Sequence, residues 1–256
     1  DAEGRLIGIN TAILSRSGGY QGIGFAVPIN MARTVMESLI THGKVVRGFM
    51  GVSIQDVNPL LQQEFKLSED HGALVGDVTP HSPADKAGLK SGDVIVSFNN
   101  KPVDDSRHLK LQVAELAPGS TVPVKIIRDG SQKSVNVTLK ELPGSEEVAD
   151  GKSQSDNASD ALNGVTVGDI DSQIRNELKL PENIKGAVVQ QVDQNSPAYE
   201  QGLRQGDVIE EINRSSVNNA EDAVKLTEHV KDKVILLKLW SHGASHYLVV
   251  DESKSE

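Results

Sequence analysis

The chain has 256 residues, a net charge of −10 and no cysteine. This length accommodates two small domains and a further segment, and the lack of cysteine excludes a disulfide framework and a thiolate zinc site. The acidic balance and an aromatic content of only 3% argue against nucleic-acid binding, which needs clustered Lys and Arg or stacking rings. Because no run of about 18 apolar residues occurs, no membrane span is expected.

Residues 1–43 are predicted to form two strands followed by a helix. Apolar runs in residues 1–11 and 22–29 flank the short segment Ser17-Gly18-Gly19. In residues 31–42 the apolar side chains recur at helical spacing, and Gly43 is expected to end the helix. Ser17 is one conceivable nucleophile, but its place between two strand-like runs favours a hairpin loop.

A motif then occurs twice, in residues 82–95 and 196–209, with a constant offset between the copies. Each copy reads Ser-Pro-Ala, then Gly-Leu, then Gly-Asp-Val-Ile. The serine is expected to cap a short helix that has proline at its first position, and the Gly-Leu glycine is expected to close it. A strand should follow, at 94–98 and 208–212. A repeat this long is a whole domain.

Each copy continues with a helix and a hairpin. The helices are predicted at 106–116 and 221–230. The hairpins are predicted to turn at Asp129-Gly130 and His242-Gly243, of which Asp-Gly is the stronger signal.

Upstream of the motif, Gly51-Val52-Ser53 corresponds to Gly164-Val165-Thr166. Together with S-P-A-x-x-A-G-L-x-x-G-D-V-I, this glycine loop resembles the bacterial type of PDZ domain found in the HtrA (DegP/DegQ) serine protease family. The segments DAEGRLIGINT and GIGFAVPI resemble the last strands of the chymotrypsin-like barrel of that family. The resemblance implies a mainly β fold with short helices: a trypsin-like barrel remnant (1–43), a first PDZ domain (44–142), a linker (143–161) and a second PDZ domain (162–256).

Residues 143–161 contain several acids with Ser, Gly and Asn and little apolar bulk. Such a composition buries too little to order itself, so a flexible linker is predicted. An acidic docking segment is the alternative.

The resemblance places the catalytic triad upstream of Asp1, so no catalytic residue is expected in this chain. The seven histidines fall at turns and surface positions, where none would supply the missing base. The parent protein would be a serine endopeptidase, while the chain alone should be inactive. No cofactor and no metal site are expected.

The PDZ resemblance also implies how a ligand binds. An extended peptide adds as a strand beside a helix, and glycines let backbone N–H groups approach its terminal carboxylate. The expected peptide-binding residues are Arg47, Gly48, Phe49, Met50, Gly51, Val52, Ser53 and Ile54, with His108 and Leu111 on the helix wall. Phe49 and Met50 have a second interpretation, as core residues that fill the loop.

The second copy departs from this pattern, because Ala161-Leu162-Asn163-Gly164-Val165 keeps one glycine and no arginine. Carboxylate binding is therefore doubtful there, and assembly contacts are expected instead.

Two functions remain. The first is the substrate-binding and regulatory portion of a periplasmic HtrA-type protease and chaperone in envelope protein quality control and stress response. Its partners would be misfolded segments, C-terminal peptides and further copies of the chain, which the family assembles as trimers. The alternative is a non-enzymatic tandem PDZ adaptor. Residues 1–43 favour the first function, because an adaptor has no use for two orphan barrel strands.

Overall fold

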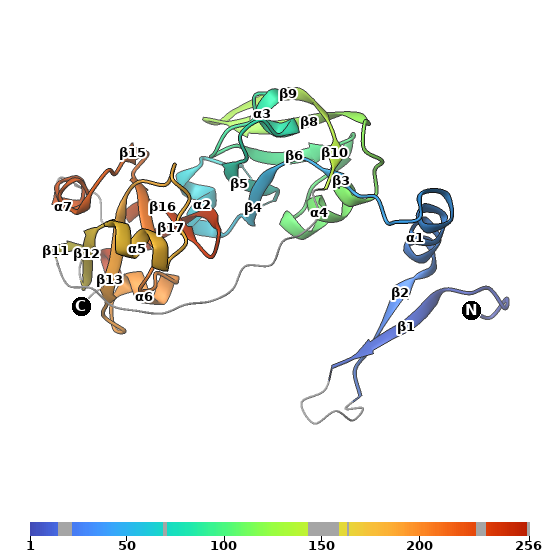
Figure 1. The fold of residues 1–256 in the computed structure, drawn as a ribbon, viewed down its shortest axis with the longest axis horizontal. Coiled ribbons are helices and arrows are strands. Elements are labelled where there is room, and N and C mark those ends of the chain that lie inside the picture. Colours follow the sequence, from blue (N-terminus) through green and yellow to red (C-terminus); the bar gives the residue numbers. More distant parts are fainter. Residues whose placement is uncertain (15–21, 69–70, 143–158, 163, 229–233, 255–256) are drawn as a thin grey trace.

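The computed structural model describes residues 1–14, 22–68, 71–142, 159–162, 164–228 and 234–254. Its ribbon has an N-terminal arm followed by two β units (Figure 1). Ser17 and the linker residues 143–158 lie outside the described residues. The predicted mainly β class is confirmed, and the described strands form no closed barrel.

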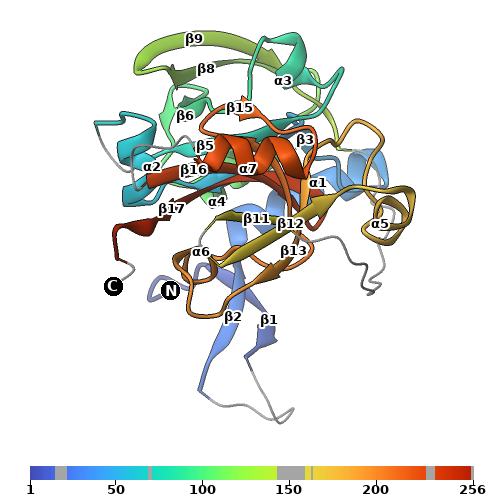
Figure 2. The same ribbon diagram turned by 90° about the vertical axis from the view of Figure 1, so that its left-hand side faces the viewer.

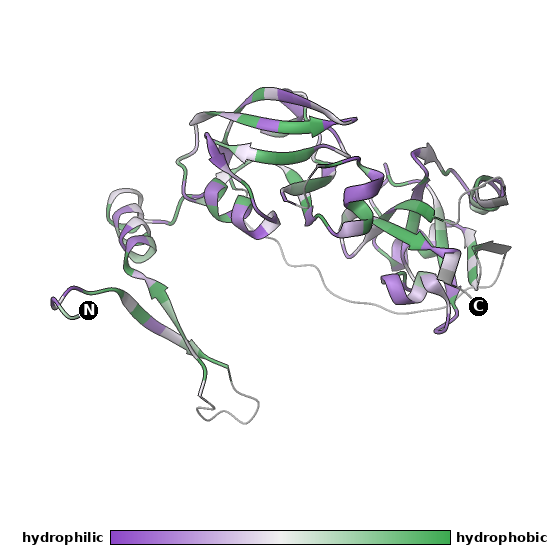
Figure 3. Ribbon diagram, turned by 180° about the vertical axis from the view of Figure 1, so that it is seen from behind, coloured by the Kyte–Doolittle hydropathy of each residue, from purple (hydrophilic) through white to green (hydrophobic). Residues whose placement is uncertain are grey.

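The N-terminal arm is a two-stranded hairpin with one helix. Strands β1 (Gly8–Ile13) and β2 (Gly24–Pro28) pair antiparallel, and helix α1 (Ile29–His42) follows. As predicted, Gly43 ends the helix in the left-handed conformation, with φ of 69°. Apolar side chains stay exposed along the arm, whose hydropathy Figure 3 shows; they include Leu6, Ile7, Ile9, Ile13, Ile23, Phe25, Met36, Leu39 and Ile40. A two-stranded hairpin on its own is marginally stable, and these side chains leave the arm with an exposed apolar surface.

The first unit is a twisted sheet with short helices. Its central strands follow the order β4-β5-β6-β8-β9, with β7 beside β6, while β3 pairs separately with β10. The elements are β3 (Gly48–Phe49), β4 (Val52–Asp56), α2 (Pro59–Glu64), β5 (Ala73–Val78), α3 (Pro83–Lys86), β6 (Val94–Phe98), β7 (Lys101–Pro102), α4 (Ser106–Ala114), β8 (Thr121–Arg128), β9 (Ser131–Thr138) and β10 (Lys140–Glu141).

The second unit repeats this plan with one addition. Its sheet has the order β11-β12-β13-β14-β16-β17, with β15 beside β14. The elements are β11 (Ser159–Leu162), β12 (Val165–Asp169), α5 (Ser172–Glu177), β13 (Ala187–Val192), α6 (Pro197–Gln201), β14 (Val208–Ile212), β15 (Ser215–Ser216), α7 (Ala220–Glu228), β16 (Val234–Ser241), β17 (Ala244–Asp251) and the 3-10 turn η1 (Glu252–Lys254). Strand β11 was not expected, because its first residues fall in the segment predicted as linker.

The repeated motif folds as predicted in both units. The Ser82 hydroxyl accepts a bond from the Asp85 N–H at 3.2 Å, and the Ser196 hydroxyl accepts one from the Tyr199 N–H at 3.2 Å. Gly202 takes the left-handed conformation that closes α6. Both predicted hairpins also form, at Asp129-Gly130 and at His242-Gly243, and all four turn residues have positive φ.

Each unit has its own apolar core, and a third cluster joins the two units. This interdomain cluster combines Val57, Leu61, Phe65, Leu74 and Val94 with Leu236, Tyr247 and Val249. The rings of Phe65 and Tyr247 meet edge to face at 5.2 Å. The Gln55 side chain donates to the Tyr247 carbonyl at 2.9 Å and accepts from the Tyr247 N–H at 2.6 Å. Strand β17 therefore lies on the outer face of the first sheet.

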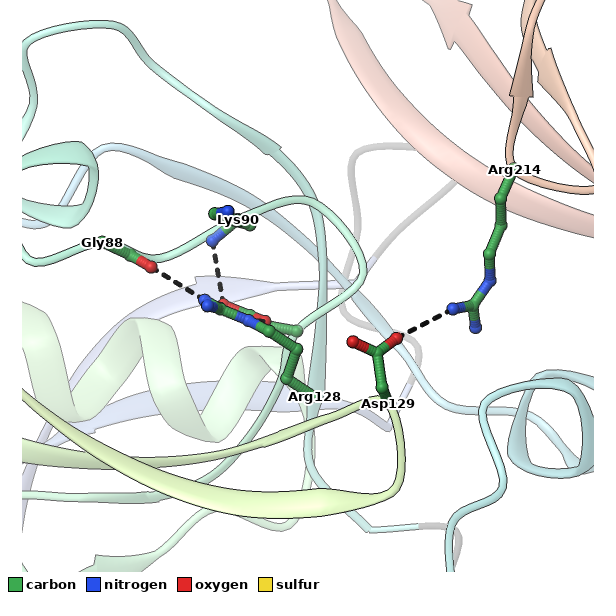
Figure 4. A network of polar contacts seen from close by, with 6 residues as sticks. Gly88, Lys90, Arg128, Asp129 and Arg214 are labelled. Atoms are coloured by element: carbon green, nitrogen blue, oxygen red, sulfur yellow. Dashed lines mark hydrogen bonds and ion pairs between the residues drawn. The ribbon is translucent and has the colours of Figure 1, made fainter.

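A polar network borders this contact (Figure 4). The Asp93 carboxylate is fully buried and accepts two bonds from the Arg128 guanidinium, at 2.5 and 2.7 Å. Arg128 also donates to the Gly88 carbonyl at 2.8 Å. The next residue, Asp129, pairs at 3.1 Å with Arg214 of the second unit. Arg128 at the end of β8 thus contacts Asp93 of the first unit's Gly-Asp motif, and its neighbour Asp129 contacts the second unit.

Candidate peptide groove and relatives

The loop from β3 to β4 is built on two glycines that tolerate no side chain. A Cβ at Gly48 would lie 2.5 Å from the Val113 carbonyl, so the backbone there packs directly on the end of α4. Gly51 has φ of 83°, and its Cβ would lie 2.2 Å from that of Ser82. A larger residue at Gly51 would disturb the fold itself, so such a variant is no clean test of ligand binding.

A cavity of about 320 Å³ lies between this loop, β4 and α4. Its lining is mostly apolar, and it contains two cationic residues, Arg47 and Lys110, and no acidic one among the described residues. Strand β4 is the last strand of its sheet, so among the described strands none pairs with its outer edge. An open strand edge beside an apolar cavity accepts an extended segment.

The structure brings most of the predicted site residues together here. Arg47, Gly48, Phe49, Met50, Gly51, Val52 and Ile54 all line the cavity. Met50 is only 3% exposed and belongs to the first core, whereas Phe49 is half-buried. The core interpretation therefore holds for Met50. Because side chains alternate along a strand, Ser53 does not join Val52 and Ile54 in the lining.

The two residues expected on the helix wall lie elsewhere. His108 Nδ1 is 3.1 Å from the Asp104 carboxylate, outside the cavity lining. Leu111 lines a separate cavity of about 470 Å³ between α1 and α4, together with Met31 and Val35.

On the α4 side, the cavity is lined instead by four residues that no sequence motif marks: Leu109, Lys110, Val113 and Ala114. Leu109 and Val113 are four residues apart, and so are Lys110 and Ala114. This is the helical spacing of one face, so these four residues share the face of α4 that borders the cavity. Leu142 also lines the cavity. It comes from the far end of the unit, and no local pattern signals that.

Comparisons with known proteins agree with this geometry. Residues 48–139 and residues 188–241 each match the PDZ domain family. A "Probable periplasmic serine endoprotease DegP-like" of Chlamydia trachomatis is 37% identical over 96% of this chain and 48% of its own length. A protein of the same name from Brucella suis is 38% identical over 98% of this chain and 48% of its own length.

The chain carries two PDZ domains and is similar over nearly its whole length to HtrA/DegP-like serine endoproteases. The solved structure "HtrA-type protease AlgW with tripeptide" is 41% identical, covers 57% of this chain and 48% of that chain, and has a TM-score of 0.50. The chain spans about half the length of the curated relatives it matches. The predicted periplasmic location is borne out by the names of these relatives. Among the residues that the structure describes, no helix is long and apolar enough to cross a membrane.

Proposed function

We propose that the first PDZ domain binds the C-terminal or extended segments of unfolded proteins by strand addition to β4. The observation that carries this proposal is the open edge of β4 beside the mostly apolar cavity. The terminal carboxylate of the peptide would lie at the Gly48–Gly51 loop, near Arg47, and its last apolar side chain would enter the cavity against Leu109 and Val113. A similar structure is described as an HtrA-type protease with a tripeptide, which supports peptide binding.

Within a longer protein, this binding would serve a serine endoprotease and chaperone of envelope quality control. The catalytic residues would lie outside this chain. We also propose that residues 44–142 and residues 162–256 are the two PDZ domains, and that the chain assembles into a homo-oligomer. The exposed apolar side chains of the β1–β2 arm favour this function over a free-standing adaptor, because they need a protein partner to cover them.

Titration of one apolar-ended peptide, as free acid and as C-terminal amide, into the 256-residue chain tests peptide binding. We expect a Kd of about 1 μM for the free acid, roughly −8 kcal/mol. Amidation removes a charge-assisted contact worth about 1.5–3 kcal/mol, so affinity should fall by roughly tenfold to a hundredfold.

Arg47→Gln should weaken the free acid more than the amide. Arg33→Gln is the matched control, because Arg33 is an exposed arginine on α1 that pairs with Glu37 and does not line the cavity. Equal affinities of acid and amide in the unmodified chain would contradict the carboxylate assignment.

A further inference from the structure

The grooves of the two PDZ domains differ in one respect. In the first domain, β4 is the last strand of its sheet. In the second domain, the equivalent strand β12 is followed outward by β11, which pairs antiparallel with it: Ser159 opposite Val167, Asp160 opposite Thr166, and Leu162 opposite Val165. Strands β11 and β13 occupy opposite edges of β12. The chain itself therefore covers the edge that is open in the first domain.

The equivalence of β4 and β12 rests on contacts as well as sequence. Asp56, at the end of β4, accepts a bond from the Ser106 N–H at 2.8 Å, at the start of α4. Asp169, at the end of β12, accepts a bond from the Ala220 N–H at 2.8 Å, at the start of α7. Both strands are thus tied in the same way to the helix that walls the groove.

Strand β11 also contacts this groove helix. Helix α7 packs against β11 as well as β12, and the two ribbon views place β11 next to β12 in the part of the domain where α7 lies (Figures 1 and 2). Leu162 at the end of β11 is 7% exposed and belongs to the core with Val165, Val167 and Ala223. A strand that adds to the sheet edge, contacts the helix and buries an apolar side chain satisfies the requirements of a PDZ ligand.

Among the described strands, a pairing found in the first domain and not in the second explains the difference. There, the segment that enters the domain forms β3 and pairs with β10, which holds it away from the edge of β4. In the second domain, β17 passes directly into η1, and the described residues provide no counterpart of β10. The entering segment satisfies its backbone groups on β12 instead.

We propose that β11 is a built-in strand ligand that closes the groove of the second PDZ domain, so that the first domain provides the one open peptide groove of the tandem. A segment from another protein reaches β12 only after β11 detaches. Its apparent association constant is therefore the intrinsic constant multiplied by the fraction of molecules in which β11 is detached. This inference rests on the strand-addition mode proposed above.

Hydrogen exchange in the unmodified chain gives the first test, which needs no variant. Alternate amides of a strand point to its outer edge. We expect the amides of Val165, Thr166 and Val167, which β11 covers, all to be protected, whereas alternate amides of Val52–Asp56 exchange rapidly. Rapid exchange at the outer edge of both strands would overturn the proposal.

The second test supplies β11 in trans. The probe is an acetylated and amidated peptide with the sequence of residues 157–164, which lacks a free carboxylate. Asp160→Pro should release β11, because proline removes a ladder N–H and is poorly tolerated inside a paired strand. Asp160→Ala is the matched control that keeps the strand.

We expect the probe to bind Asp160→Pro at least about tenfold more tightly than the unmodified chain or Asp160→Ala, with NMR shifts in β12 and α7. Equal binding to all three proteins, or binding to none with Asp160→Pro folded, would overturn the proposal. If Asp160→Pro fails to fold, the hydrogen-exchange result decides. A parallel titration with a free-acid peptide, read at β4, reports separately on the first domain.

Discussion

Glu210 is an acid buried where the two domains meet. Its side chain is 14% exposed on β14, and its carboxylate is 4.0 Å from the Lys238 ammonium. Burial raises the pKa of Glu210 above its ordinary value, and the carboxylates of Asp77 and Glu211 add to this effect. The Ser245 hydroxyl and Lys238 oppose it without cancelling it. Asp77 belongs to the first domain, so charge on Glu210 acts across the contact.

The raised pKa makes stability depend on pH in a defined direction. The folded chain binds this proton more readily than the unfolded chain, so the contribution of Glu210 to stability is largest below the pKa of an ordinary carboxyl group. It is lost as the pH rises through the folded pKa. Glu210→Gln should therefore unfold at a higher temperature than the unmodified chain at about pH 8, and the difference should shrink at about pH 4.

Melting curves of both proteins across this pH range check the prediction. Glu182→Gln is the control, because Glu182 is exposed on the surface of the same domain. A lower melting temperature of Glu210→Gln at about pH 8 would show that the pair with Lys238 outweighs the cost of burial.

At the scale of elements, helices α3 and α6 begin with the same Ser-Pro-Ala motif, but the two capping serines bond to different loops. Ser82 caps α3 and also donates to the Gly51 carbonyl at 3.3 Å, inside the peptide loop. Ser196 caps α6 and donates to the Asp193 carbonyl at 2.7 Å. Only the first serine thus supports the loop beside the open groove.

Alanine substitutions separate the two roles. Ser82→Ala and Ser196→Ala should each destabilise their own domain by about 1 kcal/mol, which is the usual worth of an N-cap. Only Ser82→Ala should also weaken peptide binding, because the loop loses its bond to Gly51. Denaturant titrations and peptide binding measured on the same preparations give both quantities. Equal peptide affinity in the two variants would contradict a role of Ser82 in the loop.

Local signals explain which elements could be predicted. The cap Ser82 with Pro83 and the turn Asp129-Gly130 act over a few residues, and they suffice to predict α3 and the β8–β9 hairpin. His242-Gly243 was a weaker signal but forms the same turn. The loop residues 47–52 were assigned through the PDZ resemblance, and they line one cavity in the structure.

The remaining features depend on contacts between distant segments. Strand β11 has a linker-like composition at its start, and its pairing follows from the second domain's lack of a β10 counterpart among the described residues. Leu142 reaches the groove because its N–H donates to the Arg47 carbonyl at 3.0 Å. These two residues lie at opposite ends of the first domain's sequence. Similarly, Phe65 and Tyr247 meet although no repeat or motif relates them.

At the scale of the whole chain, the contact between the domains depends on a close approach at Gly76. A Cβ on Gly76 would lie 2.1 Å from the Ser245 carbonyl, and its three nearest atoms all belong to Ser245 and His246 of the second domain. Gly76 has no positive φ. Alanine is therefore compatible with β5 itself and conflicts only with β17.

Gly76→Ala should separate the two PDZ domains while both stay folded. Small-angle X-ray scattering of the whole chain should give a larger radius of gyration, and hydrogen exchange at β5 should increase because β17 no longer covers it. Gly24→Ala is the matched control, because its added Cβ would meet only the Ala12 carbonyl at 3.9 Å.

The same variant also tests whether the groove and the domain contact are independent. Gln55 faces the second domain, whereas Val52 and Ile54 line the cavity on the opposite face of β4. Changes at sites without shared partners usually act independently, so peptide affinity of Gly76→Ala should stay within roughly twofold of the unmodified chain. An unchanged radius of gyration would contradict the domain contact. A large change in affinity would instead show that the second domain holds β4 in its binding geometry.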